Sequence, residues 1–212
     1  LAPRFAYSSL RGFQTYVPQR MSGFAGISKR RRGMDFEQFP ELVQYLTRRF
    51  PHVSKQQNAP EAQGEVKYLD IKPIENELAR VKKIAGSTFP EMFMTAASPG
   101  IIASTMLNAY YKTNDEYLDA LSREMRKEYL AIHKAGLLLQ IDAPDLAMDR
   151  TMFHRDLSDA AFVKEVEKQV DAINRAMTGT ERPDPAEKTG PFDYRERVMM
   201  IQRVEVPSLD MD

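Results

Sequence analysis

Two aspartates, Asp142 and Asp145, follow a short apolar segment and are the first residues in this sequence that suggest chemistry. Leu137–Ile141 is largely apolar, with Gly136 before it and Pro144 soon after it, a pattern typical of a buried strand in a parallel sheet. Barrels and open α/β sheets bind ligands at the carboxyl ends of such strands. Because Pro144 restricts the backbone there, Asp142 should be held in place, and a fixed carboxylate suits an ammonium group. A strand followed by a helix-capping aspartate is the alternative interpretation.

A second candidate binding residue, Ser98, follows another apolar segment. Glu91–Ala97 is expected to be a core strand, and Ser98-Pro99-Gly100 then makes a tight turn from strand to helix. The backbone amides after this turn could face an anion or a carboxylate. Plain turn chemistry explains the same three residues, and both interpretations stay open.

The rest of the sequence supplies the helices and loops that position these two strand ends. Residues 1–34 show no sustained helical period and are expected to be loop and short extended pieces. Elsewhere, apolar residues three or four positions apart predict amphipathic helices, with caps, glycine or proline at their ends. In order, we expect a helix capped by Asp35 and ending near Arg49, a loop over 52–64, a strand over Val66–Ile71, a helix from Pro73 to Gly86, and helices over Ile101–Tyr111, Asp115–Ala135 (capped by Asn114 or Asp115) and Ser158–Met177.

The two strands and the helices between them form a β–α–β crossover. A strand at 92–97, helices up to 135 and a strand at 137–142 follow one another with no other strand between them. Such a connection makes the two strands parallel and neighbouring. We therefore expect Ser98 and Asp142 at the same edge of the sheet.

The composition is that of an ordinary globular protein. Of 212 residues, 42% are hydrophobic and 28% are charged, and the formal net charge is +0, so no overall field attracts nucleic acid or a membrane surface. No segment approaches the ~18 consecutive apolar residues of a membrane span. The sequence has no cysteine, which excludes disulfides and thiolate ligands and is compatible with the cytoplasm, the location we expect. The basic run Lys29–Arg32 could contact phosphate, although a solvated loop is the favoured interpretation.

Standard catalytic signatures are absent from the sequence. It contains no phosphate loop, no Gly-rich dinucleotide fingerprint and no Gly-x-Ser-x-Gly elbow. The three histidines, His52, His133 and His154, have no second ligand at a convincing metal-binding spacing, so a structural role is the favoured interpretation of each.

Several segments together nevertheless resemble one family. They are Met94–Gly100, Asn108–Tyr111 followed by Glu116-Tyr117, Arg126–Tyr129 and Leu139–Ala147, with Gly12-Phe13-x-x-Tyr16 and Arg20–Phe24 before them. In this order they resemble the catalytic barrel of cobalamin-independent methionine synthase, in the short single-barrel form related to its C-terminal domain. The similarity runs from about residue 11 to about residue 177.

The resemblance implies a (β/α)8 barrel that transfers a methyl group from a folate to the thiol of homocysteine. In that family a zinc ion binds and ionises the thiol, because the thiolate is the competent nucleophile. Asp142 corresponds to the acid at the fourth strand end that holds the substrate amine. Ser98 lies at the third strand end, on the same rim. It is a second substrate-binding candidate, and the resemblance implies no specific role for it. Homocysteine-like thiols and methyl-folates are the partners that the resemblance implies.

The sequence departs from the family pattern after Met177. Relatives place a His-x-Cys zinc pair on the fifth strand at this point, whereas this chain continues with Thr178–Pro185 and never supplies cysteine. A complete barrel typically needs about 250 residues. We therefore expect residues 1–177 to form a partial TIM (β/α)8 barrel of the methionine synthase and uroporphyrinogen decarboxylase-like type, and 178–212 to be a divergent tail. We also expect the chain to hold no zinc and to be an incomplete, inactive form.

Two other functions remain open. Another enzyme of the uroporphyrinogen-decarboxylase-like superfamily, such as a thiol-coenzyme transferase, would share the barrel and differ at its ligand-binding ends. A non-catalytic interaction protein would instead use the open edges and apolar faces of a partial barrel to bind a partner or a second copy of the chain. Residues 198–206 could pair with the sheet as a substitute edge strand.

Overall fold

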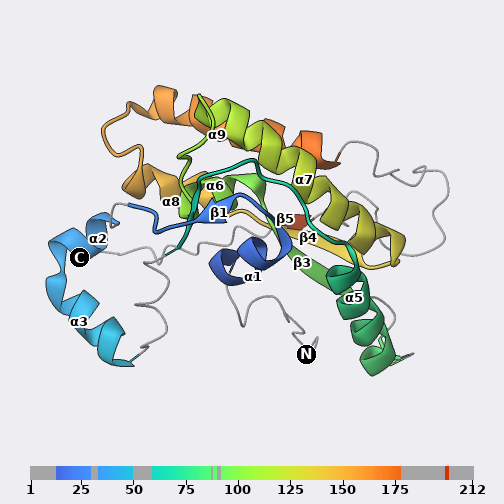
Figure 1. The fold of residues 1–212 in the computed structure, drawn as a ribbon. Helices are drawn as coiled ribbons and strands as arrows, with labels where there is room; N and C mark the ends of the chain where they lie inside the picture. The colour runs from blue at the N-terminus through green and yellow to red at the C-terminus, as the bar shows by residue number, and fades with distance from the viewer. Residues whose placement is uncertain are drawn as a thin grey trace.

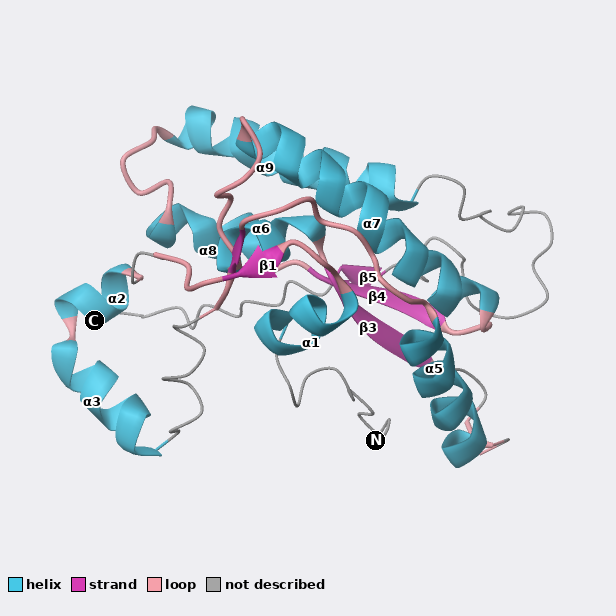
Figure 2. Cartoon of the chain, in the orientation of Figure 1, coloured by secondary structure: helices cyan, strands magenta, loops and turns pink. Residues whose placement is uncertain are grey.

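A parallel sheet of three strands lies at the centre of the molecule (Figure 1). The computed structural model describes residues 13–29, 33–49, 59–86, 88–89 and 92–177, together with the backbone of 199–200. The strands β3 (Phe93–Ala97), β4 (Leu138–Asp142) and β5 (Met199–Met200) lie in the order β3-β4-β5, and both pairs are parallel. A second, antiparallel pair joins the short strands β1 (Phe24–Ala25) and β2 (Glu61–Ala62) (Figure 2).

The connection from β3 to β4 is the expected β–α–β crossover. It contains α6 (Pro99–Thr105) and the long helix α7 (Asn114–Lys134), and Gly136, with φ +76°, makes the turn into β4. After β4 come α8 (Asp145–Met152) and α9 (Asp159–Met177). Helices α7 and α9 lie side by side (Figure 1), and α7 also packs against both β3 and β4.

The two faces of β4 differ in burial. Leu139 and Ile141 are buried and belong to a core that includes Met94 and Ala96 of β3 and Met125, Tyr129 and Ile132 of α7. On the other face of the strand, Leu138, Gln140 and Asp142 are only partly buried. Successive side chains of a strand point to opposite faces, so the apolar alternation places the core on the helix-covered side. Asp142 therefore lies on the less covered face of β4, where the neighbouring β3 residues Thr95 and Ala97 are buried.

A partly buried ion cluster joins three helices that are far apart in sequence. Arg20, at the end of α1 (Phe13–Arg20), contacts Glu128 of α7 at 3.0 Å and Glu77 of α5 (Lys72–Ala85) at 2.5 Å. The Tyr68 hydroxyl donates to the same Glu128 carboxylate at 2.6 Å. If α1 moved away, Glu128 would be left as a buried charge without the Arg20 guanidinium, which is costly. The ion pairs therefore hold α1 against α5 and α7.

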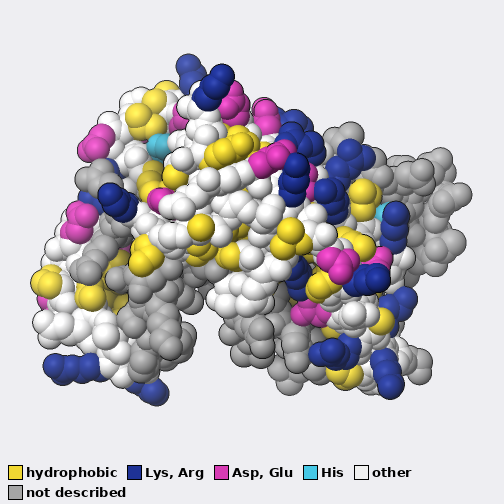
Figure 3. All heavy atoms as spheres, viewed as in Figure 1, with side chains coloured by type: hydrophobic (Ala, Val, Ile, Leu, Met, Phe, Trp, Pro, Cys, Tyr) yellow, Lys and Arg dark blue, Asp and Glu magenta, His cyan; other side chains and the backbone are white. Residues whose placement is uncertain are grey.

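Helices α2 (Met34–Gln38) and α3 (Pro40–Arg49) contribute no buried residue. They lie at one end of the molecule (Figure 1), where Arg155 forms an ion pair with Glu37 of α2 at 2.7 Å. Basic, acidic and hydrophobic side chains are interspersed on the face drawn in Figure 3, in keeping with the zero net charge. In the described ranges, no helix is long and apolar enough to cross a membrane.

Most of the elements between residues 72 and 177 agree with the sequence-based expectations. The helix from Pro73, the strands at 92–97 and 137–142, their parallel pairing and the helix after Ser158 are confirmed within one or two residues. Met199 and Met200 pair with Gln140 and Ile141, so part of the expected edge strand in 198–206 is present. The expected partial barrel is seen only as this three-stranded parallel sheet, and the described part of the chain forms no closed barrel.

Three expectations about helices were wrong: one helix was missed, one begins before its expected cap and one ends early. The loop expected over 1–34 contains α1 at Phe13–Arg20, a helix with too few apolar positions to show a period by itself. Asp35 does not cap its helix, which begins at Met34, and the helical segment breaks at Phe39 because Pro40 disfavours helical geometry in the residue before it. The helix expected over Ile101–Tyr111 ends at Thr105.

The strand expected over Val66–Ile71 is also wrong, because its backbone finds other partners. Val66 N–H donates to the Tyr111 hydroxyl at 2.8 Å, and Tyr68 N–H donates to Glu124 at 2.7 Å. Among the described residues, a single isolated bridge, between Tyr68 and Met21, joins this segment to another. These bonds replace a strand ladder and tie the segment to α7 and the loop before it.

Candidate ligand-binding rim at the strand ends

The strand-end rim, which we define as residues 97–100 and 142–145, brings together the ends of β3 and β4. Ala97 is in register with Asp142, and the Ser98 N–H donates to the Asp142 carbonyl at 3.0 Å. The expectation that Ser98 and Asp142 lie at the same edge of the sheet is confirmed. In barrels this carboxyl-terminal edge is where substrates bind.

Asp142 presents the available carboxylate of the rim. Its side chain is partly exposed on the less covered face, and within the described residues its carboxylate has no hydrogen-bond or ion-pair partner. Burial raises the pKa of Asp142 above the ordinary aspartate value. A bound cation would lower that pKa again and would satisfy the carboxylate oxygens, so the environment favours a positively charged ligand group.

Ser98 is fully buried, and its hydroxyl is used within the protein. Its Oγ accepts from the Ile101 N–H at 2.9 Å, which caps α6, and donates to Asp145 Oδ1 at 2.7 Å. A serine before the first turn of a helix commonly makes the first of these bonds. The hydroxyl therefore holds the strand-to-helix turn, as in the turn-chemistry interpretation.

Asp145 is the fully buried acid of the rim. Its Oδ2 has no partner within the described residues, and a Cβ placed on Gly100 would lie 2.0 Å from that oxygen. Burial raises the pKa of Asp145 to about 7, with a smaller contribution from the charge of Asp149. Near neutral pH the rim therefore has two different acids. Asp142 is a partly exposed carboxylate, and Asp145 is a buried acid that is protonated part of the time.

A second buried serine–aspartate hydrogen bond, Ser104–Asp149, links α8 to its neighbours. The Ser104 hydroxyl of α6 donates to Asp149 Oδ2 at 2.5 Å, and Gln169 Nε2 of α9 donates to the same oxygen at 2.9 Å. Two serine–aspartate bonds, Ser98–Asp145 and Ser104–Asp149, thus join α6 to α8. They fix the segments that follow β3 and β4, and therefore the backbone on which Asp142 stands.

Two tyrosines hold the end of β3 on the side away from β4. The Ala97 N–H donates to the Tyr16 hydroxyl at 3.2 Å, and the Tyr129 hydroxyl donates to the Ala97 carbonyl at 2.6 Å. Burial raises the pKa of Tyr129 well above its ordinary value, so the phenol stays protonated and can donate. Tertiary contacts, which no spacing in the sequence reveals, place both hydroxyls.

The described residues do not fit the zinc site that the family resemblance implies. Among them no group of three or more His, Cys, Asp or Glu side chains could hold a metal ion, and the full sequence has no cysteine. His133 is exposed in the last turn of α7, and His154 lies in the loop after α8 near the ring of Phe162. His52 and Thr178–Pro185 lie outside the described residues.

Comparison with known proteins gives a likeness in structure only. The sequence matches no protein-family profile, and no curated protein matches it. In structure the chain is similar to a B12-independent methionine synthase from Shewanella sp. W3-18-1 in complex with selenomethionine, with a TM-score of 0.50 and 16% sequence identity. The match covers 76% of this chain and spans 38% of the methionine synthase. At this identity the likeness concerns the fold.

Proposed function

We propose that the strand-end rim binds the ammonium group of a small amino acid at Asp142, as the substrate-binding part of a cobalamin-independent methyltransferase barrel. The single observation that carries this proposal is the Asp142 carboxylate, held at the end of β4 without a partner in the described residues. The fold-level likeness to a methionine synthase, itself in complex with an amino acid, supports the class of ligand. The family reaction is methyl transfer from a folate to the thiol of homocysteine.

The surroundings of Asp142 suit an ammonium ion better than a neutral or negative group. A charge-assisted bond from N–H to a carboxylate is about twice as strong as a neutral hydrogen bond. Partial burial of Asp142 limits screening by water, and the neighbouring strand end is fixed by Ser98 and by the bonds to Ala97. A preformed site loses little ordering entropy when the ligand binds.

We further propose that the chain binds its amino acid without catalysing a reaction of it. Zinc would supply the ionised thiol in the family reaction, and the described residues and the composition offer no donor set for it. Equilibrium dialysis should find no tightly held zinc, and one zinc retained per chain would contradict this part of the proposal.

Calorimetry with a matched ligand series tests amino-acid binding. Homocysteine and methionine should bind, whereas the methionine analogue in which hydrogen replaces the amino group should not. Asp142→Asn should weaken methionine binding at least about tenfold, because a charged bond is worth roughly 1.5–3 kcal/mol. Asp119→Asn removes an exposed acid of α7 and serves as the control. Equal binding of the amine-free analogue, or full affinity in Asp142→Asn, would reject the proposal.

A further inference from the structure

Two buried oxygen atoms on neighbouring helices have no hydrogen-bond donor among the described residues. One is Oδ2 of Asp145, in the first turn of α8, and the other is Oε1 of Gln169, on α9. Both side chains approach Gly100, because a Cβ there would lie 2.0 Å from Asp145 Oδ2 and 3.3 Å from Gln169 Cγ. A buried acceptor without a donor is costly, so two of them beside one glycine call for a common explanation.

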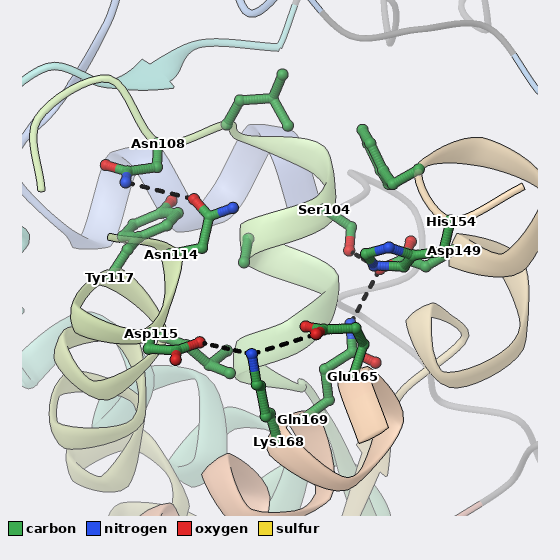
Figure 4. A pocket seen from close by; sticks show the side chains of 14 residues that line it. Ser104, Asn108, Asn114, Asp115, Tyr117, Asp149, His154, Glu165, Lys168 and Gln169 are labelled. Atoms are coloured by element: carbon green, nitrogen blue, oxygen red, sulfur yellow. Dashed lines mark hydrogen bonds and ion pairs between the residues drawn. The ribbon is translucent and has the colours of Figure 1, made fainter. Parts of the chain in front are cut away.

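The amide of Gln169 has its orientation set by Asp149. Gln169 Nε2 donates to Asp149 Oδ2 at 2.9 Å, and the Ser104 hydroxyl donates to the same oxygen. Figure 4 shows Asp149 between these two side chains, which come from α9 and α6. A carboxylate oxygen that accepts two such bonds suits the ionised form of Asp149. With its nitrogen used in this way, the amide presents only its oxygen, Oε1, to a further partner.

The side chains around Gln169 Oε1 give their donors to other groups. On α9, Lys168 Nζ lies 3.2 Å from Glu165 Oε1. The Ser98 hydroxyl donates to Oδ1 of Asp145 and not to Gln169. An aspartic acid in its protonated form is itself a donor. A proton on Asp145 Oδ2 would therefore satisfy both buried oxygens with one hydrogen bond.

The groups that face Asp145 favour its protonated form. Burial is the main reason that the pKa of Asp145 is raised to about 7, and the charges of Asp149 on α8 and Asp142 at the end of β4 add to it. The phenol of Tyr129, from α7, stays protonated because burial raises its pKa well above the ordinary value. Among the described residues, no ammonium or guanidinium group pairs with Asp145.

We propose that Asp145 and Gln169 form a proton-dependent latch, in which protonated Asp145 Oδ2 donates to Gln169 Oε1 and holds α8 against α9. When Asp145 gives its proton to water, two acceptors are left facing each other, and α8 separates from α9. The latch acts in the free protein, so it does not depend on the ligand proposed for Asp142.

Hydrogen exchange of the free protein between pH 5 and pH 7 tests the opening of α8. The docked acid has a pKa of about 7 and an undocked one about 3.9, so docking weakens as the pH rises through this range. Protection factors of the Met148 and Phe153 amides of α8 should fall at least about tenfold, and those of buried α7 amides should fall less. An equal fall in both helices, or none in α8, would overturn the proposal.

Asp145→Asn gives the matched control for exchange. Its side-chain amide donates to Gln169 Oε1 without ionising, so α8 should stay protected across the same pH range. A fall in α8 protection as large as that of the wild type would contradict the latch.

The sign of a pKa change identifies the acceptor of the Asp145 proton. With ¹³C-labelled aspartate carboxyls, Gln169→Met should lower the pKa of Asp145 by about half a unit or more, because the acceptor for its proton is lost. Ser98→Ala should raise that pKa, since Ser98 donates to the ionised form. Ser104→Ala removes the other donor to Asp149 and should have the smaller effect. An unchanged or raised pKa in Gln169→Met would contradict the latch and indicate buried water as the donor.

Discussion

At the scale of single residues, Asp145 should make stability depend on pH. Its folded-state pKa of about 7 lies above the ordinary aspartate value of about 3.9, so the native state keeps a proton that the unfolded chain loses. The stabilisation is fully present below about pH 4 and is lost progressively as the pH rises from about 4 to about 7, by roughly 1.4 kcal/mol per pH unit and about 4 kcal/mol in total.

Asp145→Asn removes this titration. Urea unfolding between pH 5 and pH 8 should show the wild type losing stability relative to Asp145→Asn as the pH rises. The exposed variant Asp119→Asn should follow the wild type. A constant difference between wild type and Asp145→Asn across this range would contradict the buried-acid assignment.

Gly100 should tolerate no side chain while Asp145 is present. A Cβ at Gly100 would lie 2.0 Å from Asp145 Oδ2, so Gly100→Ala should destabilise the fold by about 1–3 kcal/mol, the usual cost of overpacking. Combining it with Asp145→Ala should recover part of this loss in a double-mutant cycle. Gly64→Ala, whose Cβ would meet its nearest atom at 3.5 Å, is the control. Additive effects of Gly100→Ala and Asp145→Ala would show that the two residues do not conflict.

The sequence predicted the positions of the rim residues but not their interactions. Asp142 and Ser98 could be placed at one edge because an apolar strand and a β–α–β connection are readable from residue order. The bond between Ser98 and Asp145, and the tyrosine hydroxyls on Ala97, depend on side chains from other elements. Gly100, in the first turn of α6, was a usable signal, because a glycine often marks a close approach.

At the scale of elements, α7 should lose stability when its cap is removed. Thr113 Oγ1 accepts from the Glu116 N–H at 3.1 Å, so Thr113, and not Asn114 or Asp115, caps the helix. Thr113→Ala should cost about 1 kcal/mol in chemical unfolding, and Thr113→Ser should cost much less. A Thr113→Ser loss as large as that of Thr113→Ala would mean that the hydroxyl is not the stabilising group.

Elements with a long apolar period were predictable, and elements fixed by tertiary bonds were not. Helices α5 and α7 each bury an apolar face, which the three-to-four spacing reveals. Helix α9 was predicted by the same spacing but buries only Ala172, Ile173 and Ala176. By contrast, α1 depends on the contacts of Tyr16 and Arg20 with distant residues. Segment 66–71 has the composition of a strand, but side-chain acceptors such as Glu124 take its N–H groups.

At the scale of the whole molecule, we predict self-association. Phe93, Leu138 and Gln140 share one face of the sheet and are only partly buried, although Thr95 and Ala97 on the same face are buried. Parallel strands normally bury both faces. At ~25 cal/mol per Å², a few hundred Å² of uncovered apolar surface would forfeit several kcal/mol. Sedimentation should therefore show oligomers or aggregates, and Leu138→Glu should reduce them. A compact wild-type monomer with a sharp cooperative melt would contradict this prediction.

The central claim is that an amino-acid ammonium group binds at Asp142, and the titration of that carboxyl tests it most directly. In a chain with ¹³C-labelled aspartate carboxyls, Asp142 can be assigned by the signal missing from Asp142→Asn. Saturating methionine should lower the pKa of Asp142 by about one unit or more, because a nearby positive charge favours the carboxylate. The amine-free analogue should leave it unchanged. An Asp142 titration that is identical with and without methionine would contradict the account.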